Sequence, residues 1–169
     1  MRIDTMQYLS SRSIVLLLLG AVACVPVSLY EEISPNPGTN LRTHPGGVVL
    51  RIDRSKDLPN AFGGRDIFGG RVGLGYSELR FLGLSPEGQL RFRTTEVRVG
   101  SSESTMTRYG VGGTLPTLDQ TRNAYPPETT EFTLDLNHSR DLDFQGFRVH
   151  IEATASHQLT YNLWKISAQ

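Results

Sequence analysis

The C-terminal third of the chain alternates between apolar and polar residues with a period of two. The alternation is strict over residues 131–136 and recurs over 144–155 and 159–166. Side chains with that spacing lie on one face of a β-strand, so each stretch predicts a half-buried strand. We expect a turn at 137–141 between the first two strands and a kink at Gly146 within the second.

A second pattern predicts a β-hairpin over residues 79–94. Two apolar-rich runs flank residues 85–88, where Ser, Pro and Gly occupy the first, second and fourth places of a type I turn. Gly88 can adopt the positive φ that closes such a turn with a G1 bulge. The loop length then sets the pairs that face one another across the strands: Leu84 with Leu90, and Leu82 with Phe92.

The same register directs Arg91 and Arg93 to the face opposite Phe92, toward solvent or an anion. The apolar residues change face between Phe92 and Val97, which predicts a β-bulge near residues 95–96. The two arginines are therefore the first candidates for a binding face on this hairpin.

The remaining signals complete an all-β interpretation. Residues 48–53 predict a first strand, whereas the turn-rich stretches 57–76 and 101–129 predict long loops, the second with a short strand over 106–111. Outside the N-terminal segment no window of eleven or more residues shows the helical period. Short strands at intervals of about ten residues favour a single antiparallel β-sandwich or open barrel. We place this domain at residues 47–169.

The first 24 residues have the pattern of an export signal. Arg2 and Arg12 precede an unbroken apolar run over 14–19, which is followed by Ala21-Val22-Ala23 and then Cys24. A basic start, a short apolar stretch and small residues before the cleavage site are typical of secretory signals. The apolar stretch falls short of the roughly 20 residues that a transmembrane helix needs.

Cleavage of this signal has two interpretations. Residues 21–23 form an A-x-A site for ordinary signal peptidase, which would release a free periplasmic protein. The same residues followed by Cys24, the single cysteine of the chain, resemble the lipobox of bacterial lipoproteins. That resemblance implies acylation of Cys24 and, because Val25 is not Asp, sorting to the outer membrane, facing the periplasm. Translation from Met1 or from Met6 is compatible with both interpretations.

The chain therefore divides into a signal peptide, a tether and one domain. With the signal at 1–23, the lipidated residue and a flexible tether occupy 24–46. Prolines and glycines are dense over 25–46, which predicts an irregular entry loop. The domain at 47–169 is long enough to bury a core of its own.

Composition and charge exclude several classes of protein. The chain has 169 residues, 38% of them apolar, with 17 basic and 17 acidic side chains. Without a basic excess it is a poor candidate for nucleic-acid binding. A single cysteine excludes a disulfide scaffold. The partners that we expect are the lipid bilayer, through acylated Cys24, and an envelope protein or glycan.

Sequence motifs for catalysis or cofactor binding are missing. The histidines, which have no spacing that builds a metal face, are His44, His138, His150 and His157. Gly73 and Gly75 lack the third glycine and the following helix of a dinucleotide fingerprint. No serine lies in a G-x-S-x-G or S-x-x-K motif. We therefore expect a protein that is not an enzyme and uses no metal or cofactor, with an exported hydrolase as the last alternative.

Aromatic and arginine side chains define the candidate binding surface. Its members are Arg91, Arg93, Tyr109 and Tyr125. Aromatic rings beside arginine can stack on sugars or peptides, and Tyr161 and Trp164 are further rings of this kind. We expect an interaction surface made of the two long loops and the arginine face, unless Asp66 and Glu103 neutralise the arginines. A carbohydrate- or peptide-binding module is thus the alternative to a structural one.

Two segments resemble small envelope proteins of Gram-negative bacteria. They are Gly75-Tyr76-Ser77-Glu78-Leu79-Arg80-Phe81-Leu82-Gly83-Leu84 and Ser104-Thr105-Met106-Thr107-Arg108. The resemblance agrees with export and implies no functional residues. The sequence as a whole predicts a membrane-anchored envelope lipoprotein with a structural or binding β domain.

Overall fold

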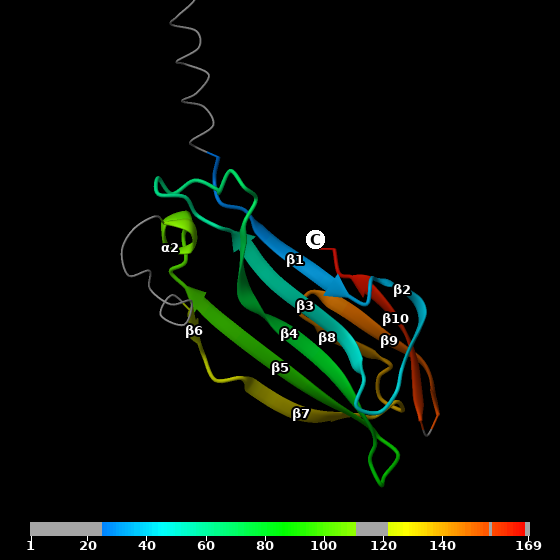
Figure 1. Cartoon of the computed structure of the whole chain (residues 1–169). Helices are drawn as coiled ribbons and strands as arrows, with labels where there is room; N and C mark the ends of the chain where they lie inside the picture. The colour runs from blue at the N-terminus through cyan, green and yellow to red at the C-terminus, as the bar shows by residue number, and fades with distance from the viewer. Residues whose placement is uncertain (1–24, 111–121, 156, 168–169) are drawn as a thin grey trace, which may run out of the picture. The chain divides into compact units, whose positions relative to one another are not determined.

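The computed structural model describes residues 25–110, 122–155 and 157–167, and nearly all of its regular structure is β-strand (Figure 1). The strands are β1 (Leu29–Ser34), β2 (Gly38–Thr43), β3 (Val48–Asp57), β4 (Arg71–Leu84), β5 (Leu90–Ser101), β6 (Arg122–Ala124), β7 (Glu128–Leu134), β8 (Asp141–Phe144), β9 (Phe147–Ala155) and β10 (Gln158–Lys165). Within these ranges the one helix is α2 (Thr105–Tyr109). The expected all-β class is confirmed.

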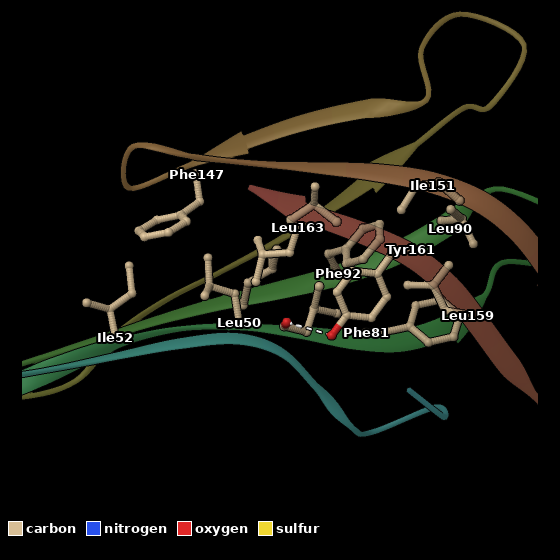
Figure 2. Close-up of a cluster of buried hydrophobic side chains, with 13 residues drawn as sticks. Leu50, Ile52, Phe81, Leu90, Phe92, Phe147, Ile151, Leu159, Tyr161 and Leu163 are labelled. Carbon is tan, nitrogen blue, oxygen red and sulfur yellow. Dashed lines mark hydrogen bonds between the residues drawn. The ribbon is translucent and has the colours of Figure 1, made fainter. Parts of the chain in front are cut away.

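The strands form two antiparallel sheets that pack face to face. The larger sheet has the order β1-β3-β4-β5-β6, with β7 also paired to β5, and the smaller has the order β2-β10-β9-β8. Buried side chains of both sheets point toward one another (Figure 2). This is the β-sandwich that the sequence predicts, and it is not a closed barrel.

The chain also divides into two compact units. The first, which we call the loop unit, contains the described residues up to Leu29, Lys56–Val72 and the described residues of Ser101–Arg122. The second, the sandwich unit, contains Tyr30–Ser55, Gly73–Gly100 and the chain from Asn123 onward.

The core of the sandwich unit follows the predicted alternation. Its fully buried side chains are Val49, Leu50, Ile52, Leu79, Phe81, Leu90, Phe92, Phe147, Val149, Ile151, Leu159, Tyr161 and Leu163. Phe92 lies between two other rings, Phe81 and Phe132, with 5.7 Å between centroids in each pair. The Tyr161 hydroxyl donates a 2.8 Å hydrogen bond to the carbonyl of Val49, so one polar link joins the two sheets inside the core.

The hairpin of β4 and β5 has the predicted turn but a different register. Gly88 has φ +81°, and Leu84 pairs with Leu90 as expected. Phe81 rather than Leu82 pairs with Phe92, because the register shifts by one residue between Phe81 and Gly83. The predicted bulge at residues 95–96 is wrong, because the pairing of β5 with β4 is continuous there. The irregularity lies on β4 instead, where Gly83 adopts φ +112°.

The turn between β8 and β9 replaces the predicted kink. The sequence predicts one long strand over 144–155, but the chain reverses at Gln145 and Gly146. Both residues have positive φ, +51° and +79°, as in a type I′ turn. Two consecutive left-handed residues close a hairpin instead of bending a strand.

Strands β1 and β2 contradict the prediction of an irregular tether over 24–46. Each forms an edge of its sheet, and each contributes one partly buried residue to the core, Ile33 and Leu41. Pro35 and Pro37 lie between the two strands and Pro26 lies before them. Proline therefore marks the ends of these edge strands, where a missing N–H does no harm, and does not prevent them.

Helix α2 occupies the place of the predicted strand over 106–111. Ser104 caps it: its side chain accepts from the Thr107 amide, and the Thr107 hydroxyl accepts from the Ser104 amide at 2.8 Å. This reciprocal capping box satisfies two amides that would otherwise lack a partner, which favours a helical turn here. Residue 111 and those up to 121 lie outside the described residues.

Candidate functional site

Arg91 and Arg93 lie on the face of the larger sheet opposite the core, and a single carboxylate partly neutralises them, because two positive charges share one negative charge. Arg91 and Arg93 lie on β5, and both donate to Glu131 of the neighbouring strand β7, at 3.1 and 3.0 Å. The hydrogen bonds, first from Arg93 and then from Arg91, hold the pKa of Glu131 below its usual range. The neutralising acid is therefore Glu131, and not Asp66 or Glu103 as the sequence suggested.

The same face of the larger sheet carries a second charged cluster. Glu78 of β4 is buried and accepts from Arg80 at 2.7 Å and from Arg51 at 3.3 Å. The guanidinium of Arg51 lies 3.7 Å from the centroid of the Tyr76 ring and binds Asp53 at 2.8 Å. Cations and carboxylates thus compensate one another along this face, which weakens its attraction for an external anion.

An aromatic face lies on the smaller sheet. The Trp164 ring of β10 is 41% exposed and stacks on His150 of β9 at 6.1 Å. The Nδ1 atom of His150 lies 2.7 Å from an Asp141 oxygen, and beside it Arg148 donates to Asp143 at 2.7 Å. An exposed ring flanked by hydrogen-bonding groups has the chemistry of a sugar-stacking surface.

The two predicted tyrosines lie in different units. Tyr109 belongs to α2 of the loop unit, where its ring meets the edge of Phe68 with 6.2 Å between centroids. Tyr125 belongs to the sandwich unit, and its amide donates to the carbonyl of Arg98 at 3.0 Å. Both rings are more than half exposed. The two tyrosines therefore belong to different units of the chain.

Parts of both predicted loops come together in the loop unit. The Thr105 amide donates to the carbonyl of Pro59 at 2.8 Å, which joins the two stretches through their backbones. The loops are shorter than predicted, because β4 begins at Arg71 and because α2, β6 and β7 lie partly or wholly within 101–129. Of the predicted loop over 57–76, only residues 58–70 therefore lie between strands.

Glu103 is a buried acidic residue of the loop unit that binds two arginines. Its side chain is fully buried and accepts from Nε of Arg108 at 2.6 Å and from Nη2 of Arg122 at 3.1 Å. Arg108 also donates to the carbonyl of Arg71 at 3.1 Å. Burial lowers the pKa of Arg108, whereas its hydrogen bonds to Glu103 and Tyr109 raise it, and the net direction is upward. Glu103 therefore joins three segments of chain and is unavailable to a ligand.

The loop over residues 58–70 is ordered by its own hydrogen bonds. The Asn60 side chain accepts from the amides of Phe62 and Gly64 and donates to the carbonyl of Arg65. At the base of the loop, Leu58 and Gly70 are joined through the backbone at 2.8 Å. Local side-chain caps of this kind fix a loop without burying its outward side chains.

This ordered loop and α2 expose large apolar side chains. They are Phe62, Ile67, Phe68, Met106 and Tyr109, and we call them the apolar patch. Three of them lie on the loop over 58–70 and are each more than three-quarters exposed. Of these five residues, only Tyr109 belongs to the binding surface that the sequence predicts. The sequence could have indicated the exposure of Phe62, Ile67 and Phe68, because these large apolar residues lie in a glycine-rich loop.

Comparisons with protein-family models, with curated proteins and with solved structures give no match. In the described part of the chain no group of three or more His, Cys, Asp or Glu side chains is placed to hold a metal ion. No helix among the described residues is long and apolar enough to span a membrane. Cys24, the predicted lipidation residue, lies outside the described residues.

Proposed function

We propose that the protein is an exported lipoprotein of the bacterial envelope, anchored by acylated Cys24, whose β-sandwich serves as a non-catalytic structural or binding module. One observation carries the proposal: the single cysteine of the chain follows a basic, apolar and small-residue signal at the position where a lipobox needs it. Three acyl chains on that residue exceed what stable membrane attachment requires.

The first described residues bear on how an anchor at Cys24 would hold the protein. The carbonyl of Val25 accepts a 3.0 Å hydrogen bond from the amide of Arg65, and Ser28 exchanges hydrogen bonds with Asp57 through its amide and carbonyl. The residue after the proposed acylation site is therefore already part of the loop unit. An acylated Cys24 would hold the loop unit directly, without a flexible spacer.

The proposal is tested by labelling cells with palmitate. The wild-type protein takes up label and fractionates with membranes, because acyl chains hold it there. The matched variant Cys24→Ser keeps the A-x-A site, loses the label and becomes soluble. A wild-type protein that is soluble and unlabelled contradicts the anchor and leaves a free periplasmic protein. Val25→Asp tests the sorting: the label persists, but the protein moves from the outer to the inner membrane.

A glycan-binding module is the second candidate function, and the exposed Trp164 ring beside His150 favours it. Trp164 is the only tryptophan, so its fluorescence reports directly on any ligand that stacks there. Titration with envelope oligosaccharides shifts or quenches this emission if the face binds sugar, and His150→Gln weakens the response. No response to peptidoglycan fragments or lipopolysaccharide sugars rules out this second function for those glycans.

A further inference from the structure

The apolar patch is a surface that the fold of the loop unit leaves open. Phe62, Ile67 and Phe68 are 87%, 76% and 77% exposed, although the loop that carries them is ordered by Asn60. Single exposed apolar residues are ordinary, but three large ones on one ordered loop, with Phe68 in ring contact with Tyr109 of α2, are a candidate interaction surface. Because the backbone is already ordered, docking costs little conformational entropy.

The charges of the loop unit favour a negatively charged partner. Its acidic residues in the described part of the chain are all buried: Asp57, Asp66 and Glu103 are at most 6% exposed. The basic residues there are intermediate or exposed: Lys56, Arg65, Arg71, Arg108 and Arg122. The surface around the patch therefore presents positive charge, although the whole chain is neutral.

The chain enters the fold at this same loop. The amide of Arg65, between Phe62 and Ile67 in sequence, holds the carbonyl of Val25 at 3.0 Å. Consecutive Cα atoms are about 3.8 Å apart, so Cys24 begins one residue from this contact. Val25, the residue after the proposed acylation site, is therefore held by the loop that carries the patch.

We propose that the apolar patch docks on the lipid bilayer that holds acylated Cys24, with Phe62, Ile67 and Phe68 among the upper acyl chains and the basic side chains on anionic headgroups. The proposal rests on the proposed function, because the acyl chains bring the patch to the membrane. A second copy of the chain fits less well, since a symmetric contact between two patches brings like charges together. The anchor and the patch together orient the loop unit on the membrane.

The test uses full-length Cys24→Ser, exported and cleaved at the A-x-A site, so that binding reports on the patch without acyl chains. It is sedimented with vesicles of phosphatidylethanolamine and phosphatidylglycerol. We expect binding that falls by about tenfold or more for each of Phe62→Ser and Phe68→Ser. The control Leu84→Ser, an exposed apolar residue of the sandwich unit, leaves binding unchanged. Replacing phosphatidylglycerol with phosphatidylcholine weakens binding by about tenfold or more.

Two results overturn the proposal: a folded Cys24→Ser protein that does not sediment with vesicles, and binding that neither phenylalanine substitution weakens. Self-association that Phe62→Ser abolishes, without vesicle binding, also overturns it and identifies a second copy as the occupant. A cooperative thermal transition of each variant confirms that it is folded. Palmitate labelling of the wild-type protein tests the anchor separately, so a missing label with intact vesicle binding refutes the anchor and supports the patch.

Discussion

Replacement of Tyr161 by phenylalanine tests how the two sheets are joined. The ring is fully buried, and its hydroxyl is the donor to the carbonyl of Val49 in the opposite sheet. Tyr161→Phe keeps the ring and leaves that carbonyl without its donor. A net hydrogen bond is worth about 1 kcal/mol and a buried unpaired group costs about 1–3 kcal/mol, so we expect a loss of about 1–2 kcal/mol in the free energy of unfolding at pH 7.

The same substitution has a characteristic pH dependence. Burial raises the pKa of Tyr161 from 10.0 to about 12. The folded state therefore holds the phenolic proton more tightly than the unfolded state does. Its contribution to stability is complete below pH 10 and is lost as the pH rises toward 12. The difference between wild type and Tyr161→Phe should narrow over that range, by at most about 1.4 kcal/mol per pH unit.

Urea unfolding at pH 7 and at steps between pH 9.5 and 11.5 measures both effects. The matched control is Tyr125→Phe, which removes a hydroxyl from a mostly exposed ring and should leave stability nearly unchanged at every pH. Equal stability of wild type and Tyr161→Phe at pH 7 would refute the inter-sheet hydrogen bond. A difference that stays constant up to pH 11.5 would refute the buried, protonated hydroxyl.

Three further experiments test other contacts. Glu103→Gln removes one of the buried acidic charges of the loop unit and should cost about 2–3 kcal/mol, less than a fully buried pair because one of its arginines is half-exposed. We expect the substitution to speed amide exchange over 56–72 more than over β9, and an equal change in both regions contradicts this expectation. Gly75→Ala should lower the free energy of unfolding, measured in urea, by more than about 2 kcal/mol, because Gly75 has φ +109° and a Cβ there would lie 1.9 Å from a carbonyl oxygen of β5. The control Gly73→Ala should leave stability nearly unchanged, because no atom lies within 4 Å of a Cβ at that position. Arg91→Ser with Arg93→Ser should leave the Tm within about 2 °C of wild type, because both ion pairs are exposed; unfolding would show that the arginines are structural.

Turn residues and hydrophobic alternation predicted the elements that are specified by residues close together in the sequence. The turn at Gly88 follows from the turn chemistry of residues 85–88, and the alternation over 159–166 correctly places Leu159, Tyr161 and Leu163 on the core side with Trp164 on the other. The residues in these segments specify their own backbone. Strand assignment therefore succeeds wherever one face is apolar.

The missed features depend on contacts between distant parts of the chain. Strands β1 and β2 are mostly polar, and only pairing to an existing sheet makes them strands. Glu131 neutralises Arg93 because β7 lies beside β5, a neighbour relation that neither strand's pattern contains. Glu103 is buried because arginines five and nineteen residues away fold onto it. Hydrophobic alternation carries no information on such polar pairs.

The mass of the mature protein purified from the envelope tests the central claim most directly. If Cys24 anchors the protein, the N-terminal peptide begins at Cys24 and carries a diacylglyceryl group and an amide-linked acyl chain. It then releases fatty acids on alkaline hydrolysis. A mature protein that begins at Cys24 with a free amine and a free thiol contradicts the account, because ordinary signal peptidase would then have released it without an anchor.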